Sequence, residues 1–103
     1  MPVYEMSHLK RIGQFGKLAP EAMGGFKALD QAALAAGAIP KKYKELMAIA
    51  VALTTQCPYC IELHRKAALA AGASEDELAE TVFVAVALRA GAAITHGAHL
   101  FPA

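Results

Sequence analysis

Two cysteines and a histidine stand close together in the stretch LTTQCPYCIELH, residues 53–64. Cys57 and Cys60 are three positions apart, and His64 follows the second cysteine by four. On a helix, positions three and four apart lie on one side, so the two sulfurs and the imidazole would face the same way. A thiol beside a base can lose its proton, and two neighbouring thiols can join as a disulfide. The spacing therefore predicts thiol redox chemistry.

Pro58 predicts that a helix begins at this pair, because proline is favoured in the first turn of a helix. Cys57 would then lie near the N-cap and Cys60 in the first turn. Free backbone N–H groups and the positive end of the helix dipole stabilise a thiolate at this position. His64 would lie one turn further along and could take the thiol proton directly or through one water.

Two other interpretations of the cysteines stay open. The pattern C-x2-C-x3-H supplies three potential zinc ligands, and a structural zinc would need a fourth from elsewhere, such as Glu45, His96 or His99. A purely structural pair is the other alternative. The chain has two cysteines in all, and such a pair in a short cytosolic chain is more typical of catalysis or metal binding than of a structural disulfide. We expect no metal and no cofactor besides the cysteine pair.

Glu45 is a carboxylate on an otherwise apolar helical face. It lies four and eight positions before Ile49 and Leu53 in a helix predicted over residues 40–56. An unpaired buried carboxylate is costly, so a partner is expected. Three lysines, 41, 42 and 44, precede it at the start of the helix, where they oppose the helix dipole. They indicate either a solvated helix start or a site that attracts an anionic partner.

The remaining patterns are helical, with no strand-like alternation and no internal repeat. One helix is predicted over residues 19–37, ending at Gly37, and another over 58–72, ending at Gly72. Ser74 and Glu77 match a capping box that opens a last helix running to about residue 98. The sequence predicts one all-α domain over residues 1–103, with a core at about 20–100 and about four to six helices.

Composition indicates self-association. The chain is 56% apolar, whereas typical domains are about 45–50% apolar. The middle of the last predicted helix is apolar nearly all round, which favours burial against other copies in a homo-oligomer. The net charge of +1 argues against binding to nucleic acid.

We also expect a cytoplasmic protein that does not enter a membrane. Residues 1–13 lack the apolar stretch of a signal peptide. The apolar run 81–94 is interrupted by Arg89 and is too short to span a bilayer. Arg89 itself would pair with an acid across a subunit contact or bind an anionic substrate. His96 and His99 would bind a metal or, more simply, favour the dipole at a helix C-terminus, and His8 would lie at the surface or an interface.

The joint spacing of Glu45, C-P-Y-C, His64 and the following AALAAGA resembles the carboxymuconolactone decarboxylase superfamily. The similarity covers about residues 20–100 and points to the AhpD-like alkylhydroperoxidase branch, because the decarboxylases generally lack the cysteine pair. It implies an all-helical subunit that assembles as a homotrimer or homohexamer. It also implies a thiol-dependent peroxidase or disulfide oxidoreductase that acts on a small hydroperoxide or disulfide, with a dithiol protein or lipoyl-type donor as reductant.

The resemblance also implies roles for these residues. Cys60 would attack the peroxide, Cys57 would resolve the sulfenic acid and exchange with the reductant, and His64 and Glu45 would relay protons. Tyr59 departs from the founding peroxidase, which carries a histidine there, so Tyr59 would donate a hydrogen bond or simply pack. Two alternatives remain from other classes: a non-redox decarboxylase-type enzyme that uses the histidine and glutamate, and a zinc-bound or structural assembly subunit.

Overall fold

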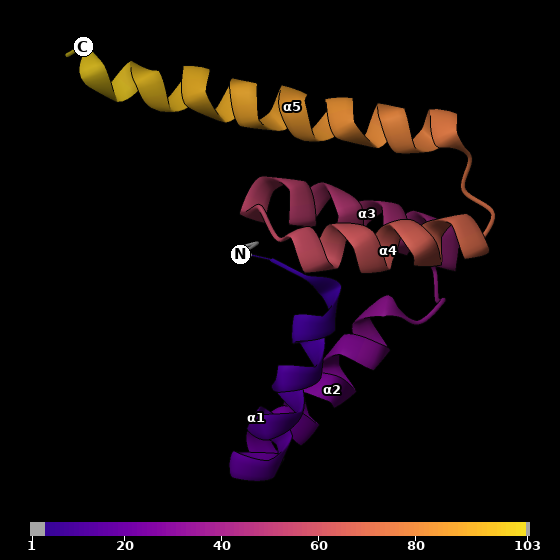
Figure 1. Ribbon diagram of the computed structural model, residues 1–103. Coiled ribbons are helices and arrows are strands. Elements are labelled where there is room, and N and C mark those ends of the chain that lie inside the picture. The colour runs from indigo at the N-terminus through magenta and orange to yellow at the C-terminus, as the bar shows by residue number, and fades with distance from the viewer. Residues whose placement is uncertain (1–3, 103) are drawn as a thin grey trace.

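The computed structural model describes residues 4–102 and is helical throughout (Figure 1). No strand is present in this part of the chain, so the predicted all-α class is confirmed. Residues 1–3 and 103 of the predicted domain lie outside the described residues. The elements in chain order are two short 3-10 helices, η1 and η2, and five α-helices: η1 Met6–Ile12, α1 Gly13–Leu18, α2 Pro20–Leu34, α3 Lys41–Thr55, α4 Pro58–Ala70, α5 Glu75–Gly97 and η2 Ala98–Leu100.

Helices α3 and α4 form an antiparallel hairpin, and α5 lies along it, while α1 and α2 project to the other side (Figure 1). The buried core is small and sits where α3, α4 and the start of α5 meet. It consists of Ile49, Ala68 and Ala73, against which three partly buried leucines, 46, 53 and 78, pack. The face that carries Glu45 and Ile49 is thus buried, as its apolar spacing predicts.

The turn between α3 and α4 places the cysteines. Gln56 ends α3 in the left-handed conformation, with φ of 57°, and this reverses the chain within one residue. Cys57 is then the N-cap of α4, and Pro58 occupies its first turn, where its missing N–H costs nothing. The predicted start of this helix is therefore confirmed. Its end is confirmed as well, because Gly72 follows with φ of 98°, a conformation that suits glycine.

The last helix begins with the predicted capping box. The Ser74 hydroxyl accepts a hydrogen bond from the Glu77 backbone, and the Glu77 carboxylate accepts one from the Ser74 backbone. These bonds satisfy two backbone donors at the start of α5 and define that start. The carboxylate of Glu77 also pairs with Lys42 of α3 at 3.0 Å, which ties the first turn of α5 to the hairpin.

The prediction that the first long helix ends at Gly37 is wrong, because α2 ends at Leu34. Lysines of the following helix cap its last turn. The Lys41 ammonium donates to the Leu34 carbonyl at 2.9 Å, and the Lys44 ammonium donates to the carbonyls of Ala33 and Ala35 at 2.9 and 2.6 Å. Cations at a helix C-terminus satisfy its free carbonyls and its dipole. The basic cluster thus serves contacts within the chain.

Residues 6–18 form η1 and α1, which the sequence patterns do not predict. They pack on α2. The described chain is extended, with a radius of gyration of 17.0 Å, whereas a compact domain of this size has about 13 Å. Large apolar side chains of α5 are exposed in the single chain, among them Phe83, Leu88 and Ile94.

Residues Glu75–Leu100 form one helix long and apolar enough to cross a membrane by length and composition alone. The apolar run 81–94 was predicted to be too short to span a bilayer. The helix extends beyond both ends of that run. The core helix of a soluble protein can have the same length and composition, so this helix alone does not indicate a membrane span.

Candidate active site

The two cysteine sulfurs lie 2.9 Å apart at the start of α4. Both cysteines are free thiols. The Cys57 sulfur also accepts a hydrogen bond from the Cys60 backbone N–H at 3.4 Å, as an N-cap side chain does. A disulfide requires about 2.05 Å between the sulfurs. A small local shift would therefore join them, and the pair can exist as a dithiol or as a disulfide.

The two thiols differ in acidity. The pKa of Cys57 is lowered, first because its sulfur accepts the hydrogen bond of the Cys60 thiol and then because it accepts backbone N–H groups. The pKa of Cys60 is raised to about 11, because its proton is held by Cys57, because it is partly buried, and because the charges of Cys57 and Asp30 are negative. In the reduced pair Cys57 is therefore the more acidic thiol and Cys60 the less acidic one.

Glu45 and His64 are paired across the α3–α4 hairpin. Glu45 Oε2 lies 2.6 Å from His64 Nδ1, and Glu45 Oε1 lies 2.8 Å from the Lys41 ammonium. Burial would raise the pKa of the Glu45 carboxyl, but the hydrogen bonds from Lys41 and His64 outweigh it, and the pKa lies below its usual value. The buried carboxylate therefore has the partner that the sequence requires. An imidazole that donates from Nδ1 keeps Nε2 as a proton acceptor.

Cys60 and His64 line one pocket of about 290 Å³. Its other walls come from α2 and α3 and are mostly apolar, with Asp30 of α2 as the one carboxylate of the lining. A small molecule in this pocket would lie among mostly apolar side chains, with a thiol, an imidazole, the Asp30 carboxylate and the Thr55 hydroxyl as the polar groups. The pocket thus suits a small substrate that reacts at sulfur.

Tyr59 lies outside this pocket's lining and packs against another tyrosine. Its ring meets that of Tyr4 edge to face, with centroids 4.8 Å apart, and the Tyr4 hydroxyl donates to Glu62 at 3.3 Å. Sequence reasoning missed Lys41 as the second partner of Glu45, although their i, i+4 spacing was a usable signal. It also missed Asp30, for which the sequence carries no signal.

The other candidate residues take no part in this site. His96 and His99 meet edge to face, with ring centroids 5.6 Å apart, and His8 lies 3.6 Å from Glu5. Among residues 4–102, no group of three His, Cys, Asp or Glu could hold a metal ion.

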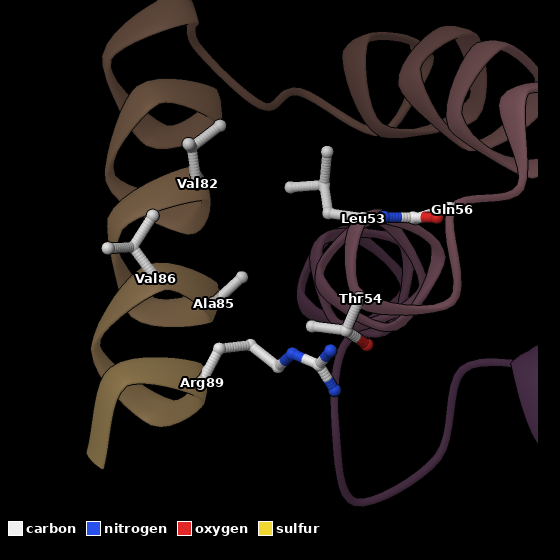
Figure 2. Close-up of a pocket in the computed structure, with 7 residues that line it drawn as sticks. All are labelled: Leu53, Thr54, Gln56, Val82, Ala85, Val86 and Arg89. Carbon is white, nitrogen blue, oxygen red and sulfur yellow. The ribbon is translucent and has the colours of Figure 1, made fainter. Parts of the chain in front are cut away.

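Arg89 lines a second, mostly apolar pocket between the end of α3 and α5, of about 390 Å³. Figure 2 shows its side chain reaching from α5 toward Thr54, with Val82, Ala85 and Val86 along the same helix. Within the described chain no carboxylate lies in ion-pair range of Arg89. The acid expected across a subunit contact stays a prediction.

The helical fold and the spacing of the glutamate, the two cysteines and the histidine define a class of proteins. Similarity to known proteins identifies the same class. The chain belongs to the carboxymuconolactone decarboxylase family, whose family model matches residues 20–101. The superfamily assignment predicted from the motif is confirmed.

Particular relatives cover most of the chain. A Haemophilus influenzae protein named "Uncharacterized protein" is 53% identical over 91 residues, 87% of this chain and 80% of its own length. "Uncharacterized protein 4 in cox locus" of Paracoccus denitrificans is 41% identical over 85 residues, 82% of this chain and 77% of its own.

Solved structures show the same fold. The crystal structure of an apo carboxymuconolactone decarboxylase family protein from Legionella pneumophila is 39% identical, with a TM-score of 0.75 over 90% of this chain and 88% of that one. A protein of Methanobacterium thermoautotrophicum is 33% identical, with a TM-score of 0.79 over 85% of this chain and 99% of that one. The family includes decarboxylases and peroxidases, so membership alone does not select the reaction.

Proposed function

We propose that this protein is a thiol-dependent peroxidase or disulfide oxidoreductase of the alkylhydroperoxidase type. The observation that carries the proposal is the pair of free sulfurs 2.9 Å apart, with one of them in a pocket beside a histidine that is bonded to a buried carboxylate. A decarboxylase-type reaction could use Glu45 and His64, but it would leave the cysteine pair without a role.

The first step would consume the peroxide at Cys60. His64 accepts the Cys60 proton at Nε2, while Glu45 stabilises the imidazolium through Nδ1. The Cys60 thiolate then attacks one peroxide oxygen, a sulfur–oxygen bond forms, and the oxygen–oxygen bond breaks. The leaving alkoxide takes the proton from His64 and departs as an alcohol. Cys60 is oxidised to a sulfenic acid, and the peroxide is reduced.

The second step would close the disulfide. The Cys57 thiolate attacks the sulfur of the Cys60 sulfenic acid, and the hydroxide that leaves takes a proton and becomes water. The lowered pKa of Cys57 suits this role, because a more acidic thiol has a larger thiolate fraction available to attack the sulfenic acid. An external dithiol, from a protein or a lipoyl-type donor, then reduces the disulfide by two exchanges and leaves as a disulfide itself. A disulfide substrate would instead meet the Cys57 thiolate first.

The proposal includes self-assembly into a homotrimer or homohexamer. The radius of gyration of 17.0 Å and the exposed apolar side chains of α5, Phe83 and Leu88 among them, support it, because monomeric proteins rarely expose large contiguous apolar patches. Sedimentation of the wild type should show one assembled species. Phe83→Glu should sediment more slowly, and a wild type that sediments as a monomer would contradict this part of the proposal.

Thiol titration with mass spectrometry, before and after mild peroxide, tests the reaction. The wild type should go from two free thiols per chain to none and lose two hydrogen atoms. Cys57→Ser should accumulate a sulfenic acid at Cys60, and Cys60→Ser should lose turnover. Full activity in Cys60→Ser, with thiols that persist after peroxide, would reject the proposal. Activity that survives loss of both cysteines would favour the non-redox enzyme, and stoichiometric zinc in the purified protein would favour the zinc-bound subunit.

A further inference from the structure

Lys41 contacts two parts of the molecule at once. Its ammonium lies 2.8 Å from Glu45 Oε1 and donates to the Leu34 carbonyl of α2 at 2.9 Å. The lysine side chain is 45% exposed, whereas that of Glu45 is only 3% exposed. Both carboxylate oxygens of this buried residue are therefore engaged, one by Lys41 and the other by His64.

We propose that Lys41 is a positioning residue of the Cys57–Cys60 site, which holds Glu45 ionised and oriented so that His64 keeps an unprotonated Nε2 toward the pocket it shares with Cys60. This inference rests on the proposed function and names the group that prepares the base for it. Lys41 acts through Glu45 and is not among the residues that line the pocket with Cys60.

The physical need for such a cation follows from burial. A buried carboxylate without a positive partner tends to take up a proton and become neutral. A neutral Glu45 would have one oxygen occupied by its own proton and would hold the imidazole less firmly. With Lys41 at Oε1, the opposite oxygen is free to accept from His64 Nδ1. That bond fixes the tautomer in which Nε2 is the acceptor.

The neighbouring Lys44 separates this role from helix capping. Lys44 donates to the Ala33 and Ala35 carbonyls at the same end of α2, but Glu45 is not among its partners. Both lysines therefore hold α2 against α3. Lys41 alone among the ammonium groups of the described chain also touches the carboxylate that orients His64.

Removing the charge of Lys41 should change how the Glu45–His64 pair titrates. The charged or titratable groups around the pair are Lys41 on α3, Cys60 on α4 and Asp30 on α2, which lines the pocket with His64. Loss of a neighbouring positive charge makes the pair as a whole bind its proton more tightly. The base then stays protonated up to a higher pH. The acid limb of the pH–rate profile, where the rate falls as pH falls, therefore shifts to higher pH.

The test compares Lys41→Gln, which keeps a donor without the charge, with Lys41→Arg and Lys44→Gln. The single-turnover rate of peroxide-driven disulfide formation is measured from pH 5 to 9. Lys41→Gln should shift the acid limb to higher pH by about one unit. At a fixed pH on that limb, the rate should then be about tenfold lower than in wild type. Lys41→Arg should restore the wild-type limb, and Lys44→Gln should leave it in place. A Lys41→Gln limb that coincides with the other three would overturn the inference.

A second readout does not depend on activity. Nitrogen-15 NMR of the His64 ring reports which nitrogen carries the proton as pH is varied. Lys41→Gln should retain a proton on Nε2 to a higher pH than wild type and Lys44→Gln. If the wild type forms no disulfide with peroxide, the proposed function fails, and this titration still decides the role of Lys41. Identical ring titrations in all variants would overturn it.

Discussion

Glu45 on α3 and His64 on α4 are 19 positions apart in the sequence, and Oε2 of the one lies 2.6 Å from Nδ1 of the other. The left-handed turn at Gln56 makes this possible, because it folds α4 back along α3. The same turn places Cys57 at the N-cap of α4. One reversal of the chain therefore sets both the sulfur pair and the pairing of base and carboxylate.

Glu45→Gln should destabilise the fold. The change removes the charge that Lys41 and His64 share, and hydrogen bonds to charged groups contribute about 2 kcal/mol. Urea unfolding should show a lower midpoint with an unchanged slope. The control is Glu80→Gln on the exposed surface of α5, for which we expect a change within about 0.5 kcal/mol. Equal midpoints for the two variants would contradict the importance of this contact.

The same carboxylate should make stability depend on acidic pH. Its pKa is lower in the folded chain than in the unfolded chain, so its contribution is fully present above the unfolded pKa, about 4.3. It is lost as pH falls through the folded value, because the unfolded state then binds the proton first. Urea midpoints should therefore fall more steeply with acid in the wild type than in Glu45→Gln. Parallel curves below pH of about 5 would show that Glu45 is not responsible.

Alkylation of the reduced protein should modify Cys57 before Cys60. The pKa of Cys57 is lowered, and the pKa of Cys60 is raised to about 11. Cys57 should react first because only thiolates react quickly. Peptide mass spectrometry after brief iodoacetamide treatment over a pH series gives each midpoint. Cys60→Ala removes the thiol donor and should raise the Cys57 midpoint, whereas Cys60→Ser keeps a hydroxyl donor and should raise it less. Faster labelling of Cys60 would reverse this assignment of the thiolate.

The same substitution at two glycines should have opposite effects on stability. Gly72→Ala places a side chain at φ of 98° and should destabilise the chain by about 1–2 kcal/mol. Gly24→Ala lies within α2 with no atom within 4 Å of the added methyl group, and it should stabilise the helix by up to about 1 kcal/mol. Thermal unfolding by circular dichroism compares them. Effects of the same sign would contradict the conformational explanation.

Much of the fold was predictable because the signals are local. Pro58, Gly72 and the Ser74–Glu77 capping box each act within a few residues, and the helices begin and end as these residues predict. The end of α2 was not predictable from Gly37, because the groups that cap it come from the next helix, with Lys44 nine positions beyond the Ala35 carbonyl it meets.

The candidate site was likewise predictable only where the signals are local in the sequence. Spacing and resemblance named Cys57, Cys60, His64 and Glu45, and the structure adds that these residues contact each other as two pairs. The order of thiol acidity was not accessible, because it depends on which sulfur accepts a hydrogen bond. Asp30 reaches the pocket only because α2 folds against α3, and no local pattern encodes that packing.

The N-cap position of Cys57 links oxidation to the helix it begins. Its sulfur stabilises the first turn of α4 by accepting the Cys60 N–H, and it does so best when it carries a charge that a disulfide lacks. By a thermodynamic cycle, whatever this contact adds to the dithiol must shift the reduction potential upward by the equivalent amount. This contact by itself would therefore make the pair a stronger oxidant than it would be without the helix N-terminus.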